Sequence, residues 1–130
     1  MKFELKRLSP EALPGAVEKA HLYRLLNEPA GAESICRDVL DVDPQNQDAL
    51  VTLLLALTDQ FDTDPSSAFA EARRVIERIT NPYAHAYYAG SVYERRAKAL
   101  YRSVPGTGPR AYEWLREAMT WYEKAERLRP

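Results

Sequence analysis

Residues 13–44 read LPGAVEKAHLYRLLNEPAGAESICRDVLDVDP. Small and apolar residues recur in this stretch every three or four positions, in two successive runs, and this spacing is typical of amphipathic helices. Pro14 and Pro29 stand at the front of the two runs, where a missing N–H leaves no hydrogen bond unmade and a fixed φ favours the first turn. The stretch therefore predicts a pair of helices at 14–27 and 29–42.

Prolines also stand at the front of helical patterns along the rest of the chain. Pro65, Pro82 and Pro109 each precede a further pattern with a period near 3.6 residues, and Asp64 and Asn81 are good candidates for N-caps before two of these prolines. The further helices are expected at 46–60, 65–79, 82–102 and 109–128. No segment alternates at period two for long enough to predict a sheet, except weakly residues 2–8. We therefore expect an all-α fold of six antiparallel helices.

Small and large residues also recur at matching places in the first and last helix pairs. The matching elements are Ala20-x-x-Tyr23 followed by Ala32-x-x-x-Cys36, and Gly90-x-x-Tyr93 followed by Ala118-x-x-x-Tyr122. A small residue lets two helices approach closely, and the large residue fills the remaining space. Pro44 and Pro130 then close the pairs. This pattern resembles the tetratricopeptide repeat, a helix pair of about 34 residues.

The resemblance implies an N-terminal segment of residues 1–12 and a TPR-like helical repeat domain of residues 13–130. The implied architecture is an antiparallel helix-pair solenoid of about three repeats. The last pair departs from the pattern, because the stretch from Tyr93 to Ala118 is much longer than the equivalent stretch from Tyr23 to Ala32. We expect two lengthened helices there, joined by residues 104–110.

In proteins of this family the first helix of each pair lines a concave face. The resemblance places nine candidate groove residues on that face, namely His21, Arg24, Val51, Leu55, Asp59, Tyr87, Ser91, Glu94 and Arg95. Leu55 and Tyr87 are expected to grip a peptide or protein segment, with Arg24 or Arg95 pairing a carboxylate. The alternative for Tyr87 is simple packing against a neighbouring helix. A family subtype clamps a C-terminal carboxylate with two residues that would be Val17 and His21 here, so that mode is not expected.

The charge balance bears on the partner. The chain has 18 Lys+Arg and 19 Asp+Glu, a net charge of -1, which excludes a uniformly basic nucleic-acid coat. The charges are uneven, however: residues 33–64 are mainly acidic and residues 94–129 mainly basic. Such asymmetry favours a polar partner or head-to-tail self-association, so a homo-oligomerising scaffold is the alternative function. A weaker alternative is RNA binding by the basic and aromatic residues of 93–102, and nucleic acid is not the expected partner.

The sequence offers little catalytic chemistry. Cys36 is the single cysteine, and it falls at a packing position of the repeat, so a dyad with His21 is not expected. The acidic stretches at 41–43 and 62–66 lack the glycine and glutamate of a calcium loop. We therefore expect a non-enzymatic protein with no cofactor and no metal. The most apolar stretch, 49–57, is too short to cross about 30 Å of hydrocarbon, so a cytoplasmic location with no membrane partner is expected.

Overall fold

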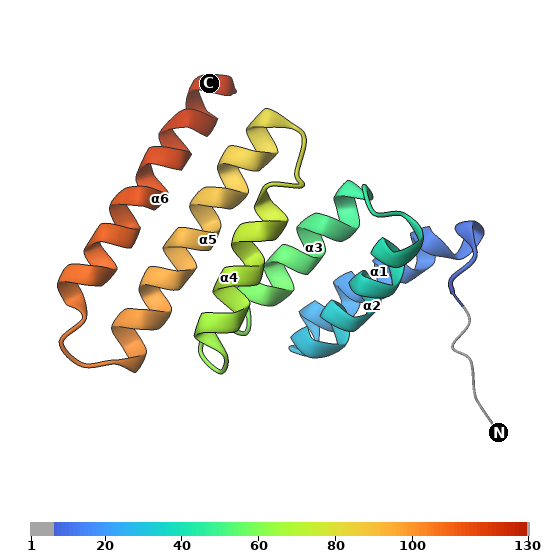
Figure 1. Ribbon diagram of the computed structural model, residues 1–130, viewed down its shortest axis with the longest axis horizontal. Helices are drawn as coiled ribbons and strands as arrows, with labels where there is room; N and C mark the ends of the chain where they lie inside the picture. The colour runs from blue at the N-terminus through green and yellow to red at the C-terminus, as the bar shows by residue number, and fades with distance from the viewer. Residues whose placement is uncertain (1–6, 130) are drawn as a thin grey trace.

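The computed structural model describes residues 7–129. Within that range it contains six α-helices, one short 3-10 helix and no strand (Figure 1). The elements are η1 (Pro10–Ala12), α1 (Leu13–Leu25), α2 (Pro29–Val42), α3 (Gln47–Thr58), α4 (Pro65–Ile76), α5 (Pro82–Ser103) and α6 (Gly108–Leu128). The all-α prediction with six helices is confirmed. The weakly alternating stretch 2–8 lies mostly outside the described residues, as does Pro130.

Prolines and asparagines set the helix starts. Helices α2, α4 and α5 begin at prolines, as predicted. The side chains of Asn46 and Asn81 accept hydrogen bonds from the backbone N–H groups of Ala49 and Ala84, both at 2.9 Å. Asp64 occupies the predicted N-cap position of α4, but its side chain makes no capping hydrogen bond. Its backbone, at φ -143° and ψ 66°, lies outside the extended region that the two asparagines adopt, so its carboxylate does not meet the first-turn amides.

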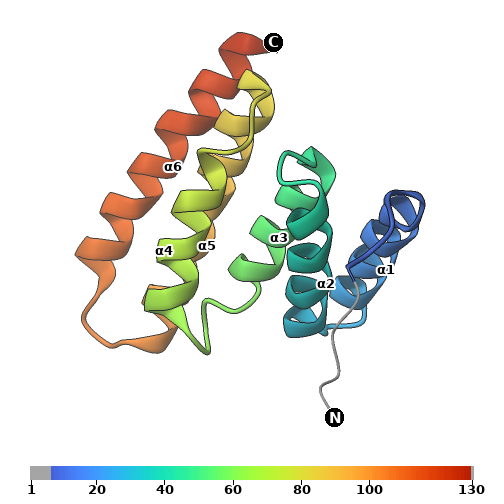
Figure 2. The same cartoon turned by 45° about the vertical axis from the view of Figure 1, so that its right-hand side comes forward.

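The helices pack against their neighbours in the chain, and alternate helices also make contact. Each helix contacts the next, α1 also contacts α3, and α3 also contacts α5. Figures 1 and 2 show the helices arrayed along the longest axis, with α1 near one end and α6 at the other. α3 lies at the centre, and Leu50, Leu53, Leu54 and Leu57 on it are at most 3% exposed. Covering from several sides explains why α3 is the most apolar helix of the chain.

Two glycines allow close helix approach. A Cβ at Gly31 of α2 would lie 2.8 Å from the Tyr23 ring of α1, and a Cβ at Gly90 of α5 would lie 2.8 Å from the Tyr122 ring of α6. Real Cβ atoms do not approach so closely, so a ring occupies the space that each missing side chain leaves. The expectation that small residues admit large neighbours is therefore confirmed at these two contacts.

The last helix pair is long, as the sequence predicts. α5 has 22 residues and α6 has 21, and residues 104–107 connect them, a shorter connection than expected because α6 begins at Gly108. Trp114 stacks on Tyr93 at 5.5 Å between ring centroids, and Trp121 lies 5.6 Å from His85. Both tryptophans thus fold inward. Among residues 7–129, no helix combines the length and the apolar character needed to span a membrane.

Candidate partner-binding groove

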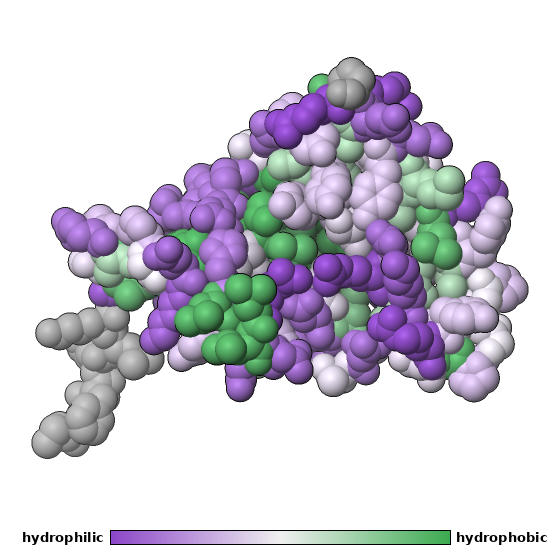
Figure 3. Space-filling model, turned by 180° about the vertical axis from the view of Figure 1, so that it is seen from behind, coloured by the Kyte–Doolittle hydropathy of each residue, from purple (hydrophilic) through white to green (hydrophobic). Residues whose placement is uncertain are grey.

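An open groove of about 600 Å³ lies where α1, α3 and α5 approach one another. It is formed by the end of α1, the end of α3 with the turn that follows, and the second half of α5. Its charged residues are Arg24, Asp59, Asp62, Arg95, Lys98 and Arg102. Leu25 and Phe61 supply apolar surface to the same groove. Figure 3 views the molecule from behind, and it shows hydrophilic side chains next to a compact area of apolar ones.

Asp59 is at the centre of the groove and binds two arginines. Arg24 donates from Nε to Oδ2 at 2.7 Å and from Nη2 to Oδ1 at 3.3 Å. Arg95 donates from Nη1 to Oδ1 at 3.1 Å and to the hydroxyl of Thr58 at 3.2 Å. The Asp59 carboxylate is 22% exposed and Arg24 is 24% exposed, so water screens this pair only partly. One carboxylate serves two guanidinium groups, and a net positive charge therefore remains.

The rim of the groove carries two further ion pairs, both from the extended part of α5. Lys98 lies 2.8 Å from Glu94, and Arg102 lies 3.1 Å from Asp62 in the turn after α3. The cations of these pairs are 58% and 60% exposed, so each pair contributes little stability and can rearrange when a ligand arrives.

Arg96, the remaining basic residue of this part of α5, points elsewhere. Its guanidinium lies 5.5 Å from the centre of the Phe69 ring of α4, where burial and the neighbouring Arg110 lower its pKa. The basic residues of 95–102 that raised the RNA alternative therefore do not share one face.

A second cluster forms around Tyr122. Its hydroxyl donates to Glu94 at 2.7 Å and lies 3.3 Å from the hydroxyl of Ser91. Burial raises the pKa of Tyr122 to about 12, so the phenol remains protonated at neutral pH. The hydrogen bonds from Lys98 and Tyr122 lower the pKa of Glu94. Tyr87 lies 5.8 Å from the Tyr122 ring and is still 42% exposed, so it packs against α6 and also presents a face to solvent.

His21 lies apart from both clusters. Its Nε2 is 3.1 Å from Asp48 Oδ1 and 3.3 Å from Thr52 Oγ1. It lines a separate hollow near the start of α1. Val51 and Leu55 are half-buried on α3, and Val51 packs against the core. The nine candidate residues therefore divide into a central cluster of Arg24, Asp59 and Arg95, a tyrosine cluster of Tyr87, Ser91 and Glu94, and three residues outside both.

Several groove residues were not among the sequence candidates. Lys98 and Arg102 follow Arg95 at helical spacing on the part of α5 that lies beyond the candidate positions, so the length of the predicted helix 82–102 was the signal. Tyr122 of α6 reaches Ser91 and Glu94 of α5 because Gly90 leaves space for its ring. The pairing of Asp62 with Arg102 joins residues far apart in the chain, and no local pattern indicates it.

Reactive side chains do not gather in the groove. Cys36 is fully buried in α2, and burial raises its pKa to about 12, so its thiol stays protonated and unreactive at neutral pH. In the part of the chain that the structure describes, no three His, Cys, Asp or Glu side chains come together to hold a metal ion. Charged donors and acceptors beside apolar surface can instead bind a polar chain. Comparison of the sequence and the structure with protein-family models, with curated proteins and with solved structures finds no match.

Proposed function

We propose that this chain is a helical-repeat protein of tetratricopeptide type that binds an acidic peptide or protein segment without transforming it. The packing supports this proposal, because α1, α3 and α5 contact one another in succession while α2 and α4 connect them. Stacked helix pairs produce this relation, and their first helices then form one continuous surface. The groove lies on that surface.

The observation that carries the proposal is the sharing of Asp59 by Arg24 and Arg95. Arg24 uses two N–H groups on this carboxylate and Arg95 uses one, whereas each guanidinium has five. Donors therefore remain for the carboxylate of a ligand. Leu25 is 81% exposed beside them, and it offers a contact for an apolar side chain next to the acidic one. The expected ligand is a segment in which Asp or Glu neighbours a large apolar residue.

Selection from a random peptide library on the purified chain tests the proposal, followed by calorimetry with the enriched peptide. We expect enrichment of an acidic residue beside an apolar one. Arg95→Gln should weaken binding about tenfold or more, because a charge-assisted hydrogen bond is lost.

Arg74→Gln is the matched control. Arg74 also pairs with a carboxylate, Glu71 at 2.6 Å, but it lies on α4 and does not line the groove. Its loss should leave the affinity unchanged. Selection that enriches no sequence, or a peptide that binds Arg95→Gln as tightly as the unaltered chain, would contradict the proposal.

A further inference from the structure

The last turn of α1 and the residue after it carry a group of exposed leucines. Leu22, Leu25 and Leu26 are 51%, 81% and 62% exposed, and Figure 3 shows a compact apolar area in the half of the molecule that carries the N-terminus. The opposite side of the helix is occupied, because Tyr23 packs against Gly31 of α2. We call these three residues the leucine patch. Apolar side chains gathered in this way mark an interaction site more often than leucines scattered singly.

The other end of the molecule carries a matching apolar surface. Tyr112, Leu115 and Met119 follow one another at spacings of three and four on α6, and they are 62%, 37% and 60% exposed. Tyr101 of α5, 69% exposed, joins Tyr112 and Leu115 in lining a hollow of about 350 Å³ between the two helices. We call these four residues the terminal stripe. The inward packing of Trp114 does not cover it.

The packing inside the chain shows what fits such a surface. α3 packs on both α1 and α2, and α5 packs on both α3 and α4, so each helix pair receives the first helix of the next pair. In the part of the chain that the structure describes, no helix occupies the equivalent place on α5 and α6. α1 is itself the first helix of a pair, and its leucine patch is exposed.

Charge favours the same match. The charged residues of the hollow, Lys98 and Arg102, are both basic, and their exposed ion pairs with Glu94 and Asp62 can rearrange. On α1, Glu18 lies one helical turn before Leu22 on the exposed side.

We propose that a second copy of this chain docks its leucine patch onto the terminal stripe, so that copies associate head to tail. The two surfaces differ, and α1 and α6, which carry most of their residues, lie toward opposite ends of the molecule (Figure 1). The contact is therefore heterologous and extends into a filament or a ring. The leucine patch shares Leu25 with the groove, and Lys98 and Arg102 line both the groove and the hollow. The proposal rests on the exposed apolar residues of the two surfaces and does not depend on peptide binding.

Sedimentation velocity over about a hundredfold range of concentration tests the association at low salt. We expect the average mass to rise from that of the 14.8 kDa chain with concentration, and to rise less at high salt. Leu22→Lys with Leu26→Lys blocks the leucine patch without altering a groove residue. Tyr112→Glu with Met119→Glu blocks the terminal stripe. Each blocked protein alone should remain a monomer.

The decisive measurement mixes the two blocked proteins in equal amounts. Each retains one intact surface, so the mixture should form a complex of two chains and nothing larger. Leu128→Lys, at an apolar position 48% exposed outside both surfaces, is the control and should associate as the unaltered chain does. Circular dichroism confirms folding, and the single variants Leu26→Lys and Tyr112→Glu replace any double variant that unfolds. A monomer at every concentration, self-association of a blocked protein, or a mixture that stays monomeric would each overturn the proposal.

Discussion

At Gly90 the fold requires the absence of a side chain. A Cβ there would lie 2.8 Å from two atoms of the Tyr122 ring and 3.1 Å from its Cγ, so the whole ring would have to move. The ring is held by the hydrogen bond from its hydroxyl to Glu94 at 2.7 Å. Glycine inside a helix ordinarily lowers stability by about 0.5–1 kcal/mol relative to alanine, so its presence here indicates that close packing outweighs helix propensity.

We therefore expect Gly90→Ala to lower the free energy of unfolding by about 1 kcal/mol, as overpacking exceeds the gain in helix propensity. In a chain that already carries Tyr122→Ala, the same change should raise stability by up to about 1 kcal/mol. Urea unfolding of the four proteins measures this reversal of sign. Gly15→Ala is the control: a Cβ there meets nothing within 4 Å, and stability should rise. Stabilisation by Gly90→Ala in both backgrounds would show that the ring yields freely.

At the scale of the helix, the starts could be predicted more accurately than the ends. Prolines and capping asparagines act locally, and α2, α4 and α5 begin at the predicted residues. α4 ends at Ile76, before the expected Ile79, although Ile79 is only 4% exposed. Apolar periodicity reports which side chains are buried, and it does not report where the helical hydrogen bonds stop. Because Ile79 is buried, it extended the apolar pattern of α4, and the predicted helix was three residues too long.

The groove could be predicted only at the positions that the resemblance to a repeat assigned. Arg24, Asp59 and Arg95 meet because α1, α3 and α5 lie in succession, a relation that the spacing of the first helices anticipated. Lys98 and Arg102 lie on the extended part of α5, where no repeat position guides the assignment. Contacts of this kind depend on the mutual tilt of whole helices, which one sequence does not specify.

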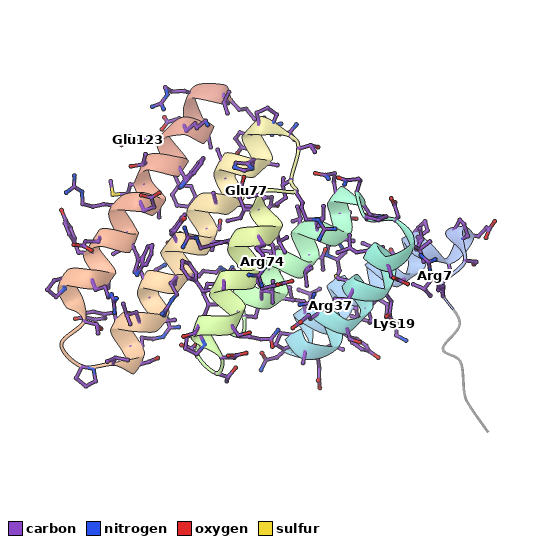
Figure 4. The ribbon with its side chains drawn as sticks, viewed as in Figure 1. Arg7, Lys19, Arg37, Arg74, Glu77 and Glu123 are labelled. Atoms are coloured by element: carbon purple, nitrogen blue, oxygen red, sulfur yellow. The ribbon has the colours of Figure 1, made fainter. Side chains whose placement is uncertain are left out.

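Glu71 joins two helices by pairing with Arg37 and Arg74, which are both labelled in Figure 4. This α4 residue accepts from Arg37 of α2 at 3.2 Å and from Arg74 at 2.6 Å, and it is 27% exposed. The hydrogen bond from Arg74, followed by that from Arg37, holds the pKa of Glu71 below its ordinary value. A carboxylate with a lowered pKa in the folded chain stabilises the fold above its unfolded pKa near 4.5, and this stabilisation is lost as the pH falls through the folded pKa.

Glu71→Gln should therefore lower the free energy of unfolding at pH 7 by a few tenths to about 1 kcal/mol. The difference from the unaltered chain should shrink as the pH falls below 4.5 and through the lowered pKa of folded Glu71, because a protonated Glu71 is as neutral as the glutamine. Urea unfolding at a series of pH values measures it. Glu77→Gln, directly after the same helix and without an ion pair among the described residues, should not lower stability at pH 7. If Glu71→Gln remains equally less stable than the unaltered chain at low pH, then the loss of stability comes from packing and not from the ion pairs.

At the scale of the whole molecule, Asp59 has two roles: it joins helices, and it competes with the proposed ligand for the same arginines. Asp59 follows directly after α3 and binds Arg24 of α1 and Arg95 of α5, so one carboxylate connects three helices. A peptide carboxylate entering the groove meets arginines that are already partly satisfied. Asp59 therefore raises the stability of the fold and lowers the affinity for an acidic ligand. Such an opposition between stability and function is common at binding sites.

Asp59→Asn separates the two roles. The side chain keeps its shape and loses its charge, which leaves two like-charged guanidinium groups together. We expect the free energy of unfolding to fall by about 1 kcal/mol at low salt, and by less at high salt because ions screen the repulsion. The affinity for the selected acidic peptide should rise several-fold, since its carboxylate replaces the missing one. Asp62→Asn, which alters a rim pair whose partners are 60% and 55% exposed, should change stability less. If peptide affinity falls together with stability in Asp59→Asn, then Asp59 orients the arginines for the ligand, and its competition with the ligand is the weaker effect.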